Sequence, residues 1–495
     1  MGAPGFFSIA DWVVILVYLL GIIALGVYFG KDQRNTRDYF LGSKNIPWWG
    51  IGLSIVAAET SALTIIGVPA MAYDVKSGNM TFIQMVIGYV IARILLAVVM
   101  VPHYFKGEIY SPYQLLENSF GPAARRTASV FFLLMETLAA GVRVYVACIP
   151  VQLMLGIGVL ESIILFVFLS LIYTYIGGVK AVIWTDAVQF GLFLAGGLFT
   201  IVYIPTLVEG GFAAVMSEAA AAGKTHWLNL NLSLQPPINI WMGVLGGTFL
   251  VMSTHGAEQL IVQRVLACKN VRDGRRALIL SAALIFPLFL IFLTVGVMLW
   301  VYYQHQPFAI PIPEARPGIK ANDFIFPIFM VTAVPHVLKG FLIVAILSAA
   351  MSSVSSAMTA LASVSTMDIM KNLLKGSRDD EFFLRFSKRS TVFWAGALIL
   401  VAFLTRKNDS VLNAAFALRG LTAGALLGSL MLTLLWRKAS STPVVIAMFA
   451  ALAVMTYIFL YTKIFWPWYT LIGTCVALGT AYLARALLPK TDAQV

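Results

Sequence analysis

The stretch Ser54–Ala70, SIVAAETSALTIIGVPA, carries a glutamate, Glu59, in the middle of an apolar run that is long enough, with its flanks, to cross a membrane. A carboxylate at bilayer depth costs a few kcal/mol on insertion scales, so a chain that keeps one turns it toward protein or water. After Glu59 the run continues with polar side chains and then with Gly67 and Pro69. Glycine and proline are frequent where membrane helices bend or break, so this sequence predicts an interrupted helix with an inward-facing carboxylate.

The composition is that of an integral membrane protein. Of the 495 residues, 60% are hydrophobic and only 11% are charged, and the mean hydropathy is +0.88. These values exclude a soluble globular protein, which needs a polar surface. Cys148, Cys268 and Cys475 are too scattered for a disulfide framework or a zinc site. The first apolar segment has no basic leader and no convincing cleavage site, so we expect it to be retained as a helix.

The distribution of apolar segments and charges predicts a single domain in the bilayer. Taking about 20 residues per crossing, we expect thirteen helices at 8–30, 47–73, 80–105, 126–155, 159–177, 180–206, 238–263, 277–303, 338–370, 390–405, 409–436, 442–462 and 466–487. With the N-terminus outside, 23 of the 34 Lys and Arg lie on the inner side and 8 on the outer side. This is the positive-inside bias, so we expect a cytoplasmic C-terminus in a plasma membrane, the inner membrane of a bacterium. The basic clusters then face anionic lipid of the bilayer, and no nucleic-acid partner is expected.

A second helix is also expected to be interrupted. The segment 238–263 contains STHGAEQ, in which polar residues and a glycine fall inside an otherwise apolar crossing. The helices of 47–206 and those of 238–436 form two sets of five, and the first helix of each set is the interrupted one. This arrangement indicates an inverted-repeat secondary transporter with its binding site near the membrane midplane. The helices at 8–30 and 442–487 would be peripheral.

The helix expected at 338–370 carries a row of small polar residues. Their spacings of three and four place them on one face of a helix, and they are Ser348, Ser352, Ser355, Ser356, Thr359, Ser363 and Thr366. Small residues can line a tight helix–helix interface. Because this row is long and includes adjacent serine doublets, we favour a path for a cation or water.

Several of these segments resemble the sodium:solute symporter family, which includes sodium-coupled sugar, proline, sialic acid and carboxylate transporters. They are AAETSALTIIG (57–67), YIGGVKAVIWTDAVQ (175–189), HGAEQLIVQRVLACKN (255–270) and AAMSSVSSAMTALASVSTMDI (349–369). The stretch GEIYSPYQLLENSFG (107–121) is similar to the segment that follows the third helix in that family. The resemblance covers the core from the second to the eleventh expected helix.

The resemblance implies an all-α fold of the leucine-transporter type, with two inverted five-helix repeats. It also implies a sodium ion between the interruption of helix 47–73 and helix 338–370. Its ligands would be the main-chain carbonyls of Ala57, Thr60 and Ala349 and the hydroxyls of Ser352 and Ser353. Such a set is chemically sensible because a hard cation needs several oxygens, and unwinding a helix frees carbonyls.

Some members of the family bind a further sodium nearer to the cytoplasm. Asp186 of the WTD motif, Ser355 and Ser356 match the residues that form that site, and Glu59 is a further candidate ligand. The coupling ion would therefore be Na⁺, one or two per cycle. Asp186 has a structural alternative as a helix cap or a salt-bridge partner at the end of a cytoplasmic half-helix.

The intramembrane charges leave several roles open. Glu59 could bind sodium directly or through water, carry a proton, or accept hydroxyls or an amine of the solute, and the structural alternative is a pair with a buried arginine. Arg143 could hold a carboxylate of the solute with its bidentate guanidinium, or it could pair with Glu59 or Glu136. We expect Arg93 and Arg419 to be structural or to snorkel toward the membrane surface.

Positions that face the substrate in members of the family suggest further contacts to the solute. Together with Arg143, the candidates are Ser61, Thr64, Gln84, Thr254 and Phe416. His255, beside the second interruption, could change its protonation near neutral pH, although we expect it to be a packing residue.

These features predict a sodium-driven symporter that imports a small polar organic solute, such as a sugar, sialic acid or carboxylate, by alternating access. We expect no enzymatic activity, because the sequence has no nucleophile–base pair, metal cluster or nucleotide motif. The functional unit is expected to be a monomer. The alternatives are a proton-coupled carrier that uses Glu59 and a transporter-like nutrient sensor.

Overall fold

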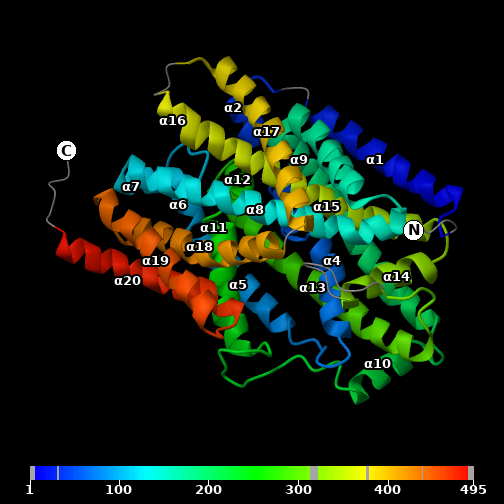
Figure 1. The fold of residues 1–495 in the computed structure, drawn as a ribbon. Helices are drawn as coiled ribbons and strands as arrows, with labels where there is room; N and C mark the ends of the chain where they lie inside the picture. Colours follow the sequence, from blue (N-terminus) through cyan, green and yellow to red (C-terminus); the bar gives the residue numbers. More distant parts are fainter. Residues whose placement is uncertain are drawn as a thin grey trace.

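A computed structural model describes residues 6–30, 33–312, 321–374, 378–407, 409–436 and 439–488 of the chain. Every regular element within these ranges is a helix, which confirms the expected all-α architecture. The long helices lie side by side, with α2 and α16 at one end of the bundle and α10 and α14 at the opposite end (Figure 1). The shorter elements are α2 (Thr36–Leu41), η1 (Gly42–Lys44), α6 (Val101–Tyr104), α7 (Tyr113–Phe120), α10 (Gly211–Ala221), η3 (Ala321–Phe324), α14 (Ile325–Thr332), α16 (Lys371–Leu373) and η5 (Trp466–Trp468).

Eight helices in the described part of the chain are long and apolar enough to cross a membrane, and one bent pair would make a ninth. The eight involve α1 (Ile9–Phe29), α8 (Pro122–Leu155), α9 (Val159–Thr206), α13 (Val271–His305), α15 (Leu338–Ser363), α17 (Asp380–Lys407), α19 (Ser441–Tyr461) and α20 (Tyr469–Leu487). Two further apolar helices, α5 (Ile83–Val99) and the 420–435 part of α18 (Asp409–Leu435), are shorter than this test requires. A multi-pass membrane fold is therefore confirmed, and the number thirteen stays a prediction.

The stretch around Glu59 forms the bent pair. Helix α3 (Trp48–Glu59) ends at Thr60, whose φ of −79° and ψ of 101° are extended, and α4 (Ala62–Tyr73) begins after Ser61. The two halves are bent by 57°. In an unbroken helix the amide of Ser61 would donate to the carbonyl of Ala57, but here it donates to Thr64 Oγ1 at 3.4 Å. The break therefore turns backbone oxygens at the end of α3 away from the helical ladder.

The predicted second interruption is also present. Helix α11 (Thr248–Gly256) follows a π-helical segment, η2 (Met242–Gly247), and ends before Glu258, whose φ of −93° and ψ of 134° are extended. Helix α12 (Gln259–Leu266) then continues the crossing. The hydroxyl of Tyr104 donates to the carbonyl of Gly256 at 2.5 Å, so one of the carbonyls freed by this break has a protein partner.

The two crossings expected at 159–177 and 180–206 are joined in one kinked element, α9. The kink lies at Gly178, where φ is 51° and ψ is −150°. A Cβ atom at this position would lie 2.3 Å from the carbonyl oxygen of Tyr39 in α2. The non-helical backbone at Gly178 thus separates two helical halves, which fit the two expected crossings, and glycine lets the chain turn between them without a loop.

Helix α15 forms the centre of the bundle. It packs against α9, α8, α1 and α17, and its whole serine- and threonine-bearing face is buried. It continues into a π-helical segment, η4 (Val364–Met370). At the periphery, α19 and α20 pack against each other and against α18 (Figure 1). The core therefore places the polar face of α15 next to the break in α3 and α4.

Candidate ion and solute site

Two cavities meet where the broken helices approach each other. The smaller one, of about 240 Å³, lies between the two breaks, and Glu59, Ser61, Arg143, Glu258 and Ser353 are among its lining residues. The larger one, of about 790 Å³, extends from Glu59 along α4 to Asp74, which follows the last residue of α4. Both Glu59 and Tyr89 line both cavities. A solute could therefore reach the breaks from the end of the bundle at which α4 ends.

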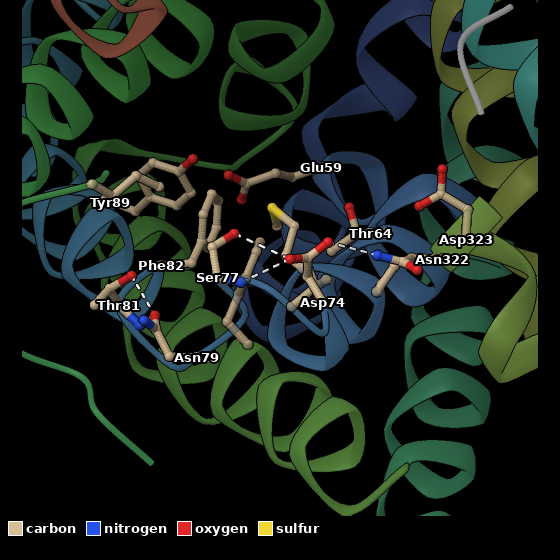
Figure 2. Close-up of a pocket in the computed structure, with 16 residues that line it drawn as sticks. Glu59, Thr64, Asp74, Ser77, Asn79, Thr81, Phe82, Tyr89, Asn322 and Asp323 are labelled. Atoms are coloured by element: carbon tan, nitrogen blue, oxygen red, sulfur yellow. Dashed lines mark hydrogen bonds between the residues drawn. The ribbon is translucent and has the colours of Figure 1, made fainter. Parts of the chain in front are cut away.

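The larger cavity is polar at its mouth. Figure 2 shows Glu59 and Tyr89 on one side and Asn79 and Thr81 on the other. Asp74 accepts hydrogen bonds from the Ser77 amide at 2.9 Å and from Asn322 Nδ2 at 2.7 Å. Burial raises the pKa of Asp74, but these Ser77 contacts, the Lys76 amide and the nearby Lys224 charge together hold it below its ordinary value. The mouth of the larger cavity thus contains an ionised carboxylate, that of Asp74.

Glu59 forms an ion pair with Arg93 of α5, not with Arg143. Its side chain is 18% exposed, whereas the side chain of Arg93 is fully buried. The Glu59–Arg143 pairing is therefore wrong, whereas the alternative in which Glu59 pairs with a buried arginine is present, and of the two roles expected for Arg93 the structural one holds. A guanidinium that cannot reach the membrane surface needs a carboxylate partner inside the protein, and Glu59 supplies it.

Arg93 also joins the two broken helices. Its Nη1 donates to the carbonyl of Tyr89 at 2.9 Å, and its Nη2 lies 3.1 Å from Nε2 of His255 at the end of α11. His255 Nε2 is itself 3.6 Å from Oε2 of Glu59. The expectation that His255 only packs is therefore incomplete, because the histidine belongs to a charged group that links α3, α5 and α11.

Arg143 reaches the smaller cavity from α8. It forms an ion pair with Glu136 of the same helix, and the two side chains are 16% and 3% exposed. The predicted alternative pairing with Glu136 is thus present, and the arginine still contributes to the cavity wall. Two guanidinium–carboxylate pairs, Glu59–Arg93 and Glu136–Arg143, lie beside one small polar cavity.

The residues expected to hold the first sodium lie on two helices that pack against each other. Ala57 and Thr60 lie at the end of α3, and Ala349, Ser352 and Ser353 lie on α15, a helix that packs against α3. The hydroxyl of Ser353 donates to the Ala349 carbonyl at 3.1 Å, and Ser353 lines the smaller cavity. These donors are carbonyl and hydroxyl oxygens, the set that half-helix ends offer to Na⁺ in transporters with broken helices.

The residues expected to hold a second sodium surround an arginine. Arg264 of α12 donates through Nη2 to Asp186 Oδ2 at 2.9 Å and to Ser356 Oγ at 2.5 Å. Asp186 Oδ1 accepts from Ser352 at 2.6 Å, while Ser355 donates to the Ser352 carbonyl at 3.1 Å. The structure thus has the predicted structural alternative, in which Asp186 is a buried salt-bridge partner. Glu59 forms its ion pair with Arg93 and not with this group.

The residues predicted to contact the solute separate into three groups. Ser61, Arg143 and Thr254 line the smaller cavity, and Thr64 lines the larger one. Gln84 lines neither cavity: it is buried, its Nε2 donates to Thr81 O at 3.1 Å, and its Oε1 accepts from the Asn229 amide. The side chains of Phe416 and Arg419 lie outside the described residues.

Sequence reasoning missed three residues of this region. Glu258 lies in the second break and lines the smaller cavity, and it stands within the STHGAEQ stretch that marked that break. Arg264 belongs to the quoted VQR motif but had no assigned role. Nothing in the sequence indicated that Tyr89 lines a cavity, because a tyrosine is common in apolar helices.

Comparisons with known proteins agree with this architecture. The model of the sodium:solute symporter family matches residues 39–451. The chain belongs to this family. It is 31% identical over 457 residues to the sodium/sialic acid symporter SiaT of Proteus mirabilis, covering 90% of this chain and 88% of that protein. It is 29% identical to the sodium/sialic acid symporter NanT of Aliivibrio fischeri, covering 97% and 94% of the two chains.

A solved structure gives the same result for the fold. A Na⁺-coupled sialic acid symporter in a substrate-bound outward-open state has a TM-score of 0.89 and 27% identity, and the match covers 99% of this chain and 100% of that one. The protein is therefore a membrane transporter and not an enzyme. It couples the import of a small solute to Na⁺ by alternating access, as the sequence predicted.

Proposed function

We propose that this member of the sodium:solute symporter family imports a small hydroxylated carboxylate, of the acidic-sugar kind, together with sodium. The observation that carries the proposal is the smaller cavity, which has an arginine, two glutamates and hydroxyl groups on its wall at the meeting point of two broken helices. The relatives named above are sodium/sialic acid symporters, and human sodium-coupled monocarboxylate transporter 1 is also 26% identical over 469 residues. Carboxylate solutes thus recur among similar proteins.

In this proposal the coupling sodium binds to Ala57, Thr60, Ala349, Ser352 and Ser353. Two of these residues belong to α3 and its end, and three belong to α15. An ion held by both would fix the break of α3 against α15, and Ser353 would connect the ion to the solute cavity because it lines that cavity. Binding of the ion would then favour the conformation that binds the solute.

The solute would be oriented by the two ion pairs. Arg143 can donate two parallel hydrogen bonds to a carboxylate of the solute. The exposed part of Glu59 can accept hydrogen bonds from hydroxyl groups of the solute, and the hydroxyls of Ser61 and Thr254 can accept or donate them. Glu59 is held by Arg93, which supports a fixed acceptor over a proton carrier. Thr64 would contact the solute on its way through the larger cavity.

We also propose the orientation and the assembly. With the N-terminus outside, the end of α4 faces outward and the larger cavity opens to the exterior, while the C-terminus is cytoplasmic in a bacterial inner membrane. Positive-inside counting supports this orientation. A monomer as the functional unit is part of the same proposal.

Uptake into proteoliposomes tests the proposal. Sialic acid should enter in sodium and not in potassium, and a neutral hexose should compete poorly. Arg143→Gln should weaken sialic acid uptake by about 2 kcal/mol, or roughly thirtyfold, because a hydrogen bond to a charged group is lost. Arg143→Lys serves as the matched variant, since it keeps the charge but not the bidentate geometry.

Two results would contradict the proposal. One is a preference for the neutral hexose over the acid in the parent protein. The other is that Arg143→Gln unfolds the protein and reduces the uptake of charged and neutral solutes equally. Arg143 would then act by stabilising the fold through its ion pair with Glu136.

A further inference from the structure

A groove lined by three arginines lies between the beginnings of α3 and α13. Its volume is about 650 Å³, and its lining includes Arg272, Arg275, Arg276, Trp48, Ile279 and Leu280. The three arginines are exposed, and within the described part of the chain none of them forms an ion pair with a carboxylate. The nearest acidic residue along the chain, Asp273, accepts from Asn270 Nδ2 at 3.3 Å. The groove is thus cationic and remote from the solute cavities.

The local structure explains why the arginines gather there. Asn270 caps the first turn of α13 by accepting from the Asp273 amide at 2.9 Å. From this fixed start, Arg272, Arg275 and Arg276 fall on one face of the helix because they are three and four residues apart. Two of the guanidinium groups are held by the protein. Arg275 donates to the carbonyls of Ala97 and Val98 at the end of α5, at 3.0 and 3.4 Å.

Arg276 is placed over an aromatic ring. Its guanidinium carbon lies 5.8 Å from the ring centroid of Trp48, the first residue of α3. Stacking of this kind orients the guanidinium plane and leaves its edge N–H groups available. Arg272 makes no hydrogen bond or ion pair with any residue that the structure describes, so its side chain is available to a ligand.

The floor of the groove is apolar and continues toward the bilayer. Ile279 is 44% exposed and lies two turns along α13 from Arg272. Next to Trp48, the ring of Trp49 is 5.3 Å from that of Trp184, which stacks on Phe29 at 5.0 Å. Clusters of tryptophan and other aromatic rings mark the level of the lipid headgroups. The arginines therefore lie at headgroup depth and the apolar floor lies beneath them.

We propose that this groove binds one anionic phospholipid. Its phosphate would contact Arg272 and Arg276, and an acyl chain would lie along Ile279 and Leu280. Arginine matches the oxygens of a phosphate in geometry and charge, and basic residues beside a membrane helix attract anionic lipid in preference to zwitterionic lipid. A soluble phosphate would use the arginines alone, whereas the apolar floor fits an acyl chain.

The site would contact a helix that belongs to the proposed sodium site. Helix α3 carries the Ala57 carbonyl, and it packs closely on α13: a Cβ at Gly52 would lie 2.9 Å from Leu280 Cδ2. A lipid that contacts both helices at their beginnings stabilises the conformation in which they are together. We therefore infer that anionic lipid raises the thermal stability of the folded protein.

Native mass spectrometry of the purified full chain tests the site. The probes are phosphatidylglycerol and phosphatidylcholine with identical acyl chains, and glycerol phosphate without any chain. The parent protein should retain phosphatidylglycerol in preference to phosphatidylcholine. Arg272→Gln with Arg276→Gln should weaken that retention by about fivefold for each arginine removed, and hence about 25-fold for the pair. Arg275 is left intact because it also holds α5.

The matched control changes two exposed arginines of α17, Arg385→Gln with Arg389→Gln, and should leave retention unchanged. The single variant Arg272→Gln guards against misfolding of the pair, because that side chain bonds to no described residue. Three results would overturn the proposal: equal retention of the two lipids, equal retention in the groove variant and the α17 control, or retention of glycerol phosphate as strong as that of phosphatidylglycerol.

Discussion

Glu59→Gln tests whether the Glu59–Arg93 pair stabilises the fold. The change keeps the size of the side chain and removes its charge, which leaves the fully buried guanidinium of Arg93 without a carboxylate. Removing one member of a buried ion pair costs about 3–5 kcal/mol. Arg93 keeps its bond to the Tyr89 carbonyl and its contact with His255. We therefore expect the lower end of that range, about 3 kcal/mol, or roughly a 150-fold change in the unfolding equilibrium.

The measurement is the free energy of unfolding in detergent micelles, for the parent, Glu59→Gln, Arg93→Gln and the double variant. The double variant should regain about 2 kcal/mol relative to the sum of the single changes, because it removes both buried charges. Glu381→Gln is the control, since the Glu381–Arg385 pair is 72% and 64% exposed, and it should change stability by less than about 0.5 kcal/mol. Additive single changes, with no recovery in the double variant, would refute the reasoning that the pair is a buried electrostatic unit.

Four further outcomes follow from the site and the fold. Ser353→Ala should raise the sodium concentration for half-maximal uptake while leaving folding intact, and undiminished uptake without sodium would exclude the proposed ion site. An inside-negative potential should leave the uptake of a monoanion with one sodium unchanged, because no net charge moves. Each net positive charge moved inward gains about 2.3 kcal/mol per 100 mV, so uptake that responds to voltage in liposomes would indicate more than one sodium per cycle. Because the pKa of Asp74 is lowered in the folded protein, the ionised carboxylate stabilises the fold above about pH 4, and this stabilisation is lost as the pH falls through the lowered pKa. The thermal midpoint of Asp74→Asn should therefore depend less on pH in that window than the midpoint of the parent. Gly178→Ala should lower the free energy of unfolding by about 1–3 kcal/mol, because the backbone there has a φ of 51°, and an unchanged thermal midpoint would contradict the account of the α9 kink.

The helical architecture could be predicted because its signals are local. Apolar runs fix the crossings, and the polar residues that follow Glu59 and those of the STHGAEQ stretch mark the places where helices are interrupted, whereas Gly67 and Pro69 lie within α4. The non-helical backbone at Gly178 could not be predicted in the same way. Whether a glycine ends a helix or only bends it depends on what packs against it, and here α2 passes so close that the Tyr39 carbonyl occupies the space of a side chain.

The candidate site was predictable in its residue types and less so in its pairings. The intramembrane charges Glu59, Arg93 and Arg143 are visible in the sequence as exceptions to an apolar pattern. Their pairing depends on the rotation of α5 and α8 about their axes, which hydropathy does not fix. The sequence therefore left the partners of Glu59 and Arg143 open, and the packing of α5 brings Arg93 to Glu59.

The guanidinium of Arg264 has a thermodynamic consequence for accumulation. It bonds to Asp186, Ser54 and Ser356 and so connects three helices beneath the break through a charge that is part of the chain. A sodium ion bound there in place of the guanidinium would be released into the cell in each transport cycle. It would multiply the maximum ratio of solute concentrations across the membrane by a further factor, the ratio of sodium concentrations. A resident charge stays behind at every turnover. The ceiling on the solute ratio across the membrane would then be set by a single ion, and the protein would deplete the sodium gradient half as fast for each molecule that it imports.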